Sequence, residues 1–152
     1  DDGAFSLPRV HIEDAPLDMS FSGLKTAMLN LIHKAQQKGE ALPVADLAAS
    51  FSAAVSEELV PRTMAAARQT GYRKVAVVGG VAANSRIRRD LEAACQQAGC
   101  TLYLPPLTLC GDNGSMIGSQ GYYEYLAGTR GGEDLNGYAN RDISLPYRRE
   151  GV

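Results

Sequence analysis

The sequence contains no tryptophan, and it has only two histidines and three cysteines among its 152 residues. The cysteines are Cys95, Cys100 and Cys110, and an odd number without C-x-x-C spacing argues against a disulfide framework or a zinc site. Free thiols are typical of a reducing compartment, which predicts a cytoplasmic protein. Cys95 falls on the apolar side of a predicted helix, where we expect a small core residue.

The scarcity of histidine limits the metal chemistry that this chain can carry. His11 and His33 stand far apart, and neither has a second histidine four positions away. We therefore interpret both as surface residues. The chain has no H-x-x-x-H or H-E-x-x-H motif and no nucleophile–base pair, so its residues give no support for a protease.

Long apolar runs and a strong net charge are also lacking. No run approaches the length of a membrane span and no signal peptide opens the sequence, so we expect no membrane association. The formal net charge of −2 provides no overall basic field for nucleic acid. The stretch "RIRRD", with Arg86, Arg88 and Arg89, is the best local candidate for such a contact. A solvated helix face is the simpler interpretation of these arginines.

Apolar periodicity predicts helices in the first half of the chain. One has an apolar face from Leu24 to Ala35 and ends near Gly39, and a second starts near Pro43 and runs through Leu59. Pro61 either kinks the second helix or opens a third, which Gly71 ends.

Two short apolar runs, "RKVAVV" and "CTLYLPP", predict strands, and each is followed by another helix. We expect three or four strands in total. The alternation of strand and helix favours an α/β fold that is rich in helix, with a small parallel or mixed sheet. Such a sheet is small for the number of helices, which suggests that part of the fold lies outside this sequence.

The stretch "VVGGVAANSRIRRDLEAAC", which begins at Val77, reads as a strand, a glycine turn and a helix. Gly79 and Gly80 end the strand, and Asn84 or Ser85 occupies the expected N-cap position. Glycines let a ligand approach the backbone, and a helix N-terminus attracts phosphate. An ordinary turn explains the same residues, so both interpretations stay open at this point.

A second stretch, "LCGDNGSM", repeats this arrangement. Asp112 precedes its helix, where it acts as a cap or as a carboxylate for a metal or ligand. Two such turns at the carboxyl ends of parallel strands would face one crevice. A single aspartate cannot hold a metal alone, so any further ligands would have to come from elsewhere.

Three segments, "LDMSFSGLKTA", "GGVAANSRIR" and "CGDNGSMIG", occur in the order found in one family. They resemble the tRNA threonylcarbamoyladenosine transferase (TsaD) family, whose patterns are D-F-S-F-S-G-L-K, G-G-V-x-x-N and C-x-D-N-x-x-M-I. Met19 replaces the common phenylalanine, and Gly111 fills the variable position before Asp112. The resemblance extends from about Phe5 to about Leu126.

The resemblance implies the ASKHA fold, which actin and sugar kinases share. It implies transfer of a threonylcarbamoyl group from threonylcarbamoyl-adenylate to a tRNA adenosine beside the anticodon. It also implies a divalent metal, iron or alternatively zinc, held by two histidines of an H-x-x-x-H motif and by Asp112. Asn84 would contact the nucleotide part of the substrate, and Gly79 and Gly80 would line the same loop.

Because the chain lacks the H-x-x-x-H motif, it resembles the carboxyl-terminal part of such a protein. Residues 1–111 would form an incomplete carboxyl-terminal lobe, and residues 112–152 a return helix and tail that pack on a missing first lobe. We expect no transferase activity from this chain alone. Four apolar residues of the return helix would be left uncovered and would favour self-association: Met116, Ile117, Tyr122 and Tyr125.

The resemblance implies tRNA, threonylcarbamoyl-adenylate, and paralogous and ATPase subunits of a modification complex as partners. Two alternatives remain. One is another ASKHA carbamoyltransferase, such as a hydrogenase-maturation enzyme, which shares a related G-G-V-x-x-N loop but which the "SFSGLK" segment disfavours. The other is a non-catalytic module that binds a partner subunit.

Overall fold

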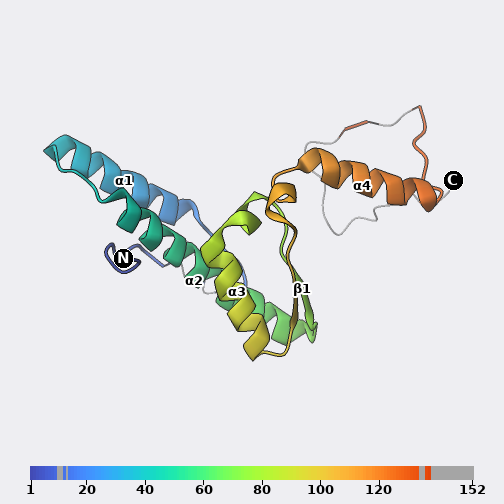
Figure 1. Ribbon diagram of the computed structural model, residues 1–152, viewed down its shortest axis with the longest axis horizontal. Coiled ribbons are helices and arrows are strands. Elements are labelled where there is room, and N and C mark those ends of the chain that lie inside the picture. The colour runs from blue at the N-terminus through green and yellow to red at the C-terminus, as the bar shows by residue number, and fades with distance from the viewer. Residues whose placement is uncertain (10–11, 13, 134–135, 138–152) are drawn as a thin grey trace. The chain divides into compact units, whose positions relative to one another are not determined.

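The structure is a computed structural model that describes residues 1–9, 12, 14–133 and 136–137. The chain divides into two compact units, Asp1–Gly111 and Asp112–Val152. The described elements follow one another as α1, α2, β1, a 3-10 turn, α3, β2, a second 3-10 turn and α4 (Figure 1). No helix in the described part of the chain is long and apolar enough to cross a membrane.

The first helix ends at the predicted glycine, and the second extends beyond its predicted apolar stripe. Helix α1 covers Ser22–Lys38 and ends at Gly39, whose φ of 67° is the left-handed conformation expected of a helix-ending glycine. Helix α2 covers Val44–Thr70 without interruption, so Pro61 opens no third helix. Proline removes one hydrogen bond of the helix, but α2 buries residues both before and after Pro61, which keeps the helix continuous.

The next segments form a strand–helix–strand unit. Strand β1 (Lys74–Ala76) and strand β2 (Thr101–Tyr103) pair in parallel, with Val75 opposite Leu102. Helix α3 (Ser85–Gln97) connects them, because parallel neighbours require a crossover. The described residues contain these two strands rather than the three or four expected, and the small parallel sheet agrees with an α/β fold.

The core of the first unit lies between α2, α3 and the sheet. Helix α3 buries Ile87, Leu91 and Cys95, which are four residues apart and therefore lie on one face. Cys95 is 1% exposed, which confirms its predicted place in the core, and it packs with Met64 and Val75. All three cysteines are free.

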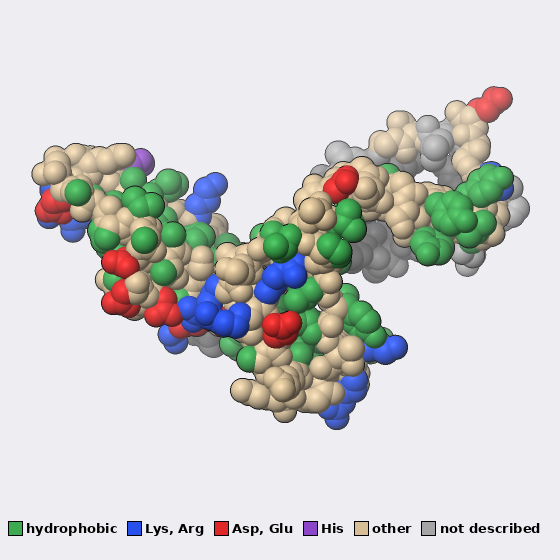
Figure 2. Space-filling view, viewed as in Figure 1, with side chains coloured by type: hydrophobic (Ala, Val, Ile, Leu, Met, Phe, Trp, Pro, Cys, Tyr) green, Lys and Arg blue, Asp and Glu red, His purple; other side chains and the backbone are tan. Residues whose placement is uncertain are grey.

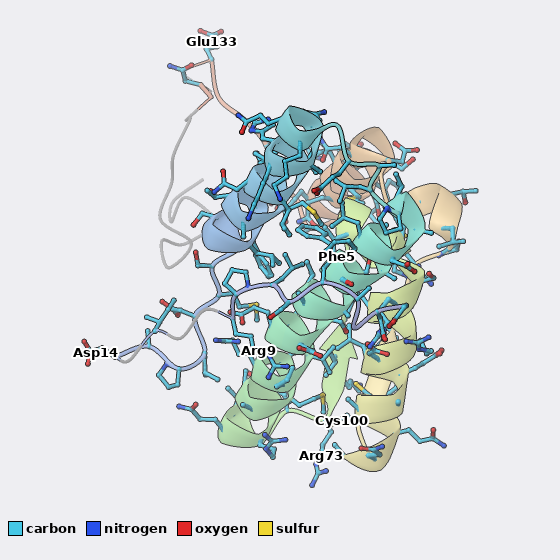
Figure 3. The ribbon with its side chains drawn as sticks, turned by 90° about the vertical axis from the view of Figure 1, so that its left-hand side faces the viewer. Phe5, Arg9, Asp14, Arg73, Cys100 and Glu133 are labelled. Atoms are coloured by element: carbon cyan, nitrogen blue, oxygen red, sulfur yellow. The ribbon has the colours of Figure 1, made fainter. Side chains whose placement is uncertain are left out.

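Polar contacts fix the N-terminal segment and the far end of the sheet. The N-terminal segment runs along α2, where the Phe5 amide donates to Ser50 Oγ at 3.2 Å and Arg9 pairs with Glu57 at 2.7 Å (Figure 3). Where the strands begin, Arg73 Nη1 donates to the carbonyl of Ala98 at 2.9 Å. Two loops follow the opposite ends of the strands, where β1 and β2 finish.

The second unit contains helix α4, which covers Asn113–Leu126 and buries none of its residues. Figure 2 shows hydrophobic side chains on the visible face of this helix. The four apolar residues predicted to be uncovered are exposed: Met116, Ile117, Tyr122 and Tyr125. The Cζ atom of Arg130 lies over the ring of Tyr125, 4.1 Å from its centre, which is a cation–π contact.

Candidate functional site

The first loop, residues 79–84, follows β1 and depends on one glycine for its path. Gly79 has φ 88° and ψ 175°, a conformation that residues with a Cβ rarely adopt. It leads into a 3-10 turn over Gly80–Ala83, in which the amide of Ala82 donates to the Gly79 carbonyl at 3.0 Å. The loop therefore turns sharply away from the strand and delivers the chain to the start of α3.

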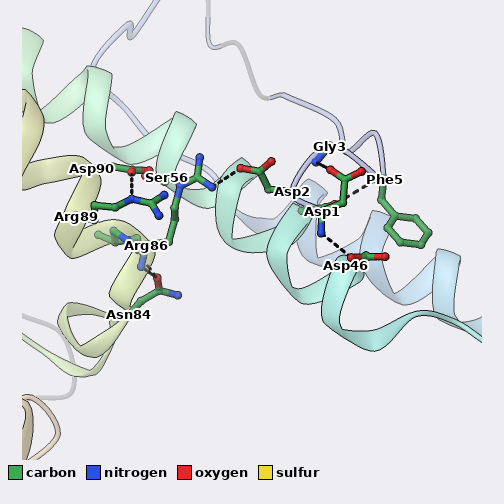
Figure 4. Close-up of polar contacts among 12 residues, drawn as sticks. Asp1, Asp2, Gly3, Phe5, Asp46, Ser56, Asn84, Arg86, Arg89 and Asp90 are labelled. Carbon is green, nitrogen blue, oxygen red and sulfur yellow. Dashed lines mark hydrogen bonds and ion pairs between the residues drawn. The ribbon is translucent and has the colours of Figure 1, made fainter.

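Asn84 is the N-cap of α3. Its Oδ1 accepts hydrogen bonds from the amides of Arg86 at 2.9 Å and Ile87 at 3.1 Å (Figure 4). Two amide donors require the oxygen, not the nitrogen, of the side chain to face the helix. The Nδ2 group of this half-buried residue makes no hydrogen bond among the described residues and remains available as a donor.

Gly80 differs from Gly79 because nothing in its conformation requires glycine. Its φ is not in the positive range, and a Cβ built on it meets no atom of the described chain within 4 Å. The described fold therefore has room for alanine at this position. A backbone left open in this way is what a closely approaching ligand requires.

The second loop, residues 105–110, follows β2 and ends at Cys110, which is 1% exposed. It contains a 3-10 turn over Leu107–Leu109, and the Cys110 thiol lies 3.5 Å from the Pro106 carbonyl. Apolar side chains are exposed in both loops, just before the first loop and at the end of β2: Val78, Val81, Tyr103, Leu107 and Leu109. These five exposed side chains, called the apolar rim below, offer contact area to a planar ring.

The two loops are joined by Arg88 of α3. Its Nε donates to the Ala82 carbonyl of the first loop. Its Nη2 donates to the Pro105 carbonyl at 2.6 Å and to Cys110 Sγ at 3.3 Å, both in the second loop. One planar guanidinium thus contacts both strand-end loops. The basic stretch drew attention in the sequence, but these backbone partners were not predicted.

The prediction of a solvated arginine face is wrong for Arg86 and Arg88, which are half-buried, and holds for Arg89. Arg86 pairs with Asp90 at 2.6 Å and also with Asp2 (Figure 4). Ser56 of α2 donates to Asp90 at 2.7 Å. Partial burial opposes ionisation of Asp90, but the hydrogen bonds from Ser56, Arg86 and Arg89 outweigh it and hold its pKa below the usual range.

Asp112 is the N-cap of α4. Its Oδ1 accepts from the Ser115 amide at 2.9 Å, and its Oδ2 accepts from the Ser115 hydroxyl at 2.7 Å. These two hydrogen bonds, the backbone one first, lower the pKa of the Asp112 carboxyl. Asp112 is exposed, and each oxygen retains a lone pair for a further partner. The capping role predicted from the sequence is therefore present.

The residues predicted to act together are found in different units. Gly79, Gly80 and Asn84 lie in one loop of the first unit, whereas Asp112 begins the second unit. Among the described residues, no group of three His, Cys, Asp or Glu side chains is arranged to hold a metal. His33 is exposed, and His11 lies outside the described residues.

A family model described as tRNA N6-adenosine threonylcarbamoyltransferase matches residues 1–119 of this chain. Three curated proteins of the same name are similar to it. The protein from Moorella thermoacetica is 50% identical over 123 residues, which are 81% of this chain and 36% of the relative. The protein from Latilactobacillus sakei is 46% identical over 148 residues, or 96% of this chain and 42% of the relative.

The third protein, from Clostridium botulinum, is 44% identical over 137 residues, which are 90% of this chain and 40% of the relative. The chain therefore spans between 36% and 42% of the length of these relatives.

Proposed function

Because this chain belongs to the tRNA N6-adenosine threonylcarbamoyltransferase family, we propose that it supplies part of a threonylcarbamoyl-transfer site. The donor would be threonylcarbamoyl-adenylate, and the acceptor a tRNA adenosine beside the anticodon. The loop built from Gly79, Gly80 and Asn84 would hold the nucleotide part of the donor. The observation that carries this proposal is the Asn84 side chain, whose oxygen caps α3 and whose Nδ2 donor is left available four residues after Gly80.

The cap on α3 determines how this loop would bind a nucleotide. The amides of Arg86 and Ile87 already donate to Asn84, which reduces the donors that the helix start offers to a phosphate. The Nδ2 group of Asn84 would donate to the ligand instead, while the exposed apolar rim would contact the base. The loop would therefore recognise the nucleoside part of the ligand more than the charge of its phosphate.

Asp112 would contribute one carboxylate to a divalent metal, iron or alternatively zinc. Its exposed oxygens fit this role, but the described residues supply no complete ligand set, so the imidazole ligands would have to come from residues outside the described ones. Such a metal supplies Lewis-acid polarisation of substrate oxygens when it is bound. This chain's own contribution is to orient the carboxylate, through the two hydrogen bonds from Ser115.

The first experiment titrates AMP into the 152-residue chain and follows backbone amides by NMR. We expect weak binding, with shifts at the amides of residues 79–85, because half a site covers only part of the ligand. Two variants separate binding from folding. Asn84→Asp keeps a capping oxygen but removes the Nδ2 donor, and Gly80→Ala fills the open space.

Both variants should melt within a few degrees of the wild type and should lose the AMP-dependent shifts. Lys25→Met, on the exposed start of α1, is the matched control and should bind AMP as the wild type does. Shifts that appear elsewhere while residues 79–85 stay unmoved would contradict the assignment of the loop.

The second experiment tests Asp112 in a chimera in which this chain replaces the matched segment of the Moorella thermoacetica relative. Wild type and Asp112→Asn are compared for metal content and for threonylcarbamoyladenosine in tRNA. Asparagine keeps the size and much of the cap but removes the charge. We expect loss of both metal and activity in the variant. Full metal content and full activity would make Asp112 a cap only.

The remaining parts of the proposal follow from the family. The protein would act in the cytoplasm with tRNA and with paralogous and ATPase partner subunits. The family match favours this function over the related carbamoyltransferases that share a similar glycine loop. The chain alone should lack transferase activity, and its exposed α4 face should cause self-association, which sedimentation at several concentrations measures.

A further inference from the structure

We propose that Arg88 is a positioning residue that ties the two strand-end loops together, so that residues 79–84 and 105–110 present one fixed face to the nucleotide. The contacts come from one guanidinium on α3, which reaches Ala82 in the first loop and Pro105 and Cys110 in the second. The catalytic consequence of this role depends on the function proposed above, whereas the mechanical role does not.

The geometry explains why these loops need such a link. Beyond the paired residues, one hydrogen bond continues the ladder, from the Val77 amide to the Tyr103 carbonyl at 3.0 Å. After that bond the chains separate into two loops, each held within itself by 3-10 hydrogen bonds. Arg88 reaches both loops from α3, which is itself anchored in the core by Ile87 and Leu91.

The surroundings of Arg88 strengthen the link. Ala82 and Cys110 are each 1% exposed, so the hydrogen bonds at these residues lie away from bulk water. A buried carbonyl that loses its donor is costly, and donors that carry a charge form the stronger bonds. The guanidinium of Arg88 is therefore held by hydrogen bonds within the protein, whereas the side chain of Arg89 is 67% exposed.

The planar fork is essential to this role. Nε serves one loop and Nη2 serves the other, and the rigid guanidinium holds these two nitrogens at a fixed separation. A lysine at the same position keeps the charge but offers a single nitrogen on a flexible stem. Arg88→Lys should thus break the link to one loop while it leaves the net charge unchanged.

The direct test is hydrogen exchange in this chain. Amides of Ala82 and Asn84 report on the first loop, and those of Leu109 and Cys110 on the second, because each donates within its own loop. In Arg88→Lys we expect exchange at these amides to rise by about tenfold or more, given the strength of charged hydrogen bonds. The amides of Leu91 and Cys95 in the core should not change.

Arg89→Lys is the matched control, one residue away on the same helix, and should leave both loops as in the wild type. Equal exchange in wild type and Arg88→Lys would overturn the proposal. A rise of the same size at Leu91 and Cys95 would also overturn it, because that result indicates general destabilisation.

A wild-type measurement keeps the test decisive if Arg88→Lys does not fold. The Nε–H of Arg88 should exchange slowly with water and show a resolved NMR signal, because it donates to a buried carbonyl. The Nε–H of Arg89 donates to Asp90 at 3.2 Å from a side chain that is 67% exposed, so it should exchange faster than that of Arg88. If the two arginines behave alike, Arg88 does not hold the loops.

The chimera described above tests the consequence for catalysis. A displacement of about 1 Å at a site can cost on the order of 100-fold in rate, so we expect Arg88→Lys to lower kcat by one to two orders of magnitude. KM for threonylcarbamoyl-adenylate should change less, and Arg89→Lys should match wild type. An inactive but folded wild-type chimera would count against the proposed function, while the exchange experiment would still decide the role of Arg88.

Discussion

Helices α3 and α4 begin in the same way and are stabilised differently. Each follows a glycine-containing turn, and each has an Asx side chain as its N-cap, Asn84 in one and Asp112 in the other. Helix α3 buries Ile87, Leu91 and Cys95, whereas α4 buries none of its residues. A cap determines where a helix starts, but most of the helix's stability comes from packing against the rest of the protein.

Composition strengthens this contrast. Helix α4 contains Gly114, Gly118 and Gly121 within its 14 residues, and each interior glycine costs a helix roughly 1 kcal/mol relative to alanine. Its tyrosines and its Ile117 point into solvent. The sequence of α4 is therefore typical of a helix that needs another surface to pack against. The sequence of α3 is typical of a helix that already packs against one.

The largest expected effect comes from truncating one apolar side chain on each helix. Leu91→Ala removes a fully buried side chain and should reduce the free energy of unfolding by about 2–5 kcal/mol. Ile117→Ala, on α4, removes a side chain that is 65% exposed and should change it by less than about 0.5 kcal/mol. Urea unfolding followed by circular dichroism measures both. A comparable loss in the two variants would show that α4 is packed in solution.

A smaller effect is expected from the polar side of α3. Asp90→Asn keeps the shape but weakens the charged hydrogen bonds with Arg86 and Ser56, and should cost about 1.5 kcal/mol at pH 7. Because the pKa of Asp90 is lowered in the fold, its contribution is present above the unfolded value of about 3.9 and disappears as pH falls through the lower folded value.

Chemical denaturation at pH 7 and at steps below pH 4 checks this prediction. The difference between wild type and Asp90→Asn should shrink as the pH falls. Glu92→Gln is the control, an exposed carboxylate on the same helix, and should follow the wild type. A difference that stays constant with pH would show that the ionised carboxylate contributes nothing.

Much of this architecture is local, and local features were predicted well. The cap at Asn84, the glycine end of α1 and the apolar face of α3 all depend on neighbours within a few residues. Pro61 was harder, because its effect depends on whether packing continues on both sides of it. The described residues contain two strands where three or four were expected, and both form in the two short apolar runs named from the sequence.

The site shows the same division. Gly79, Gly80 and Asn84 were expected in one loop and are found there. The role of Arg88 could not be predicted, because its partners lie 6, 17 and 22 residues away and two of them are backbone carbonyls. Periodicity assigns a residue to a helix face, but it does not identify the atoms that meet that face.

The smallest effect distinguishes the two caps. Asn84→Ala removes the acceptor for two amides of α3 and should lower the free energy of unfolding of the first unit by about 1 kcal/mol, because α3 is part of its core. Asp112→Ala removes the corresponding acceptor on α4, and should shorten that helix without changing the unfolding midpoint of the first unit. Urea midpoints and residue-specific NMR shifts of α4 measure the two outcomes separately. If Asp112→Ala lowered the midpoint as much as Asn84→Ala, the two helices would be coupled, and the contrast between a packed and an unpacked helix would be wrong.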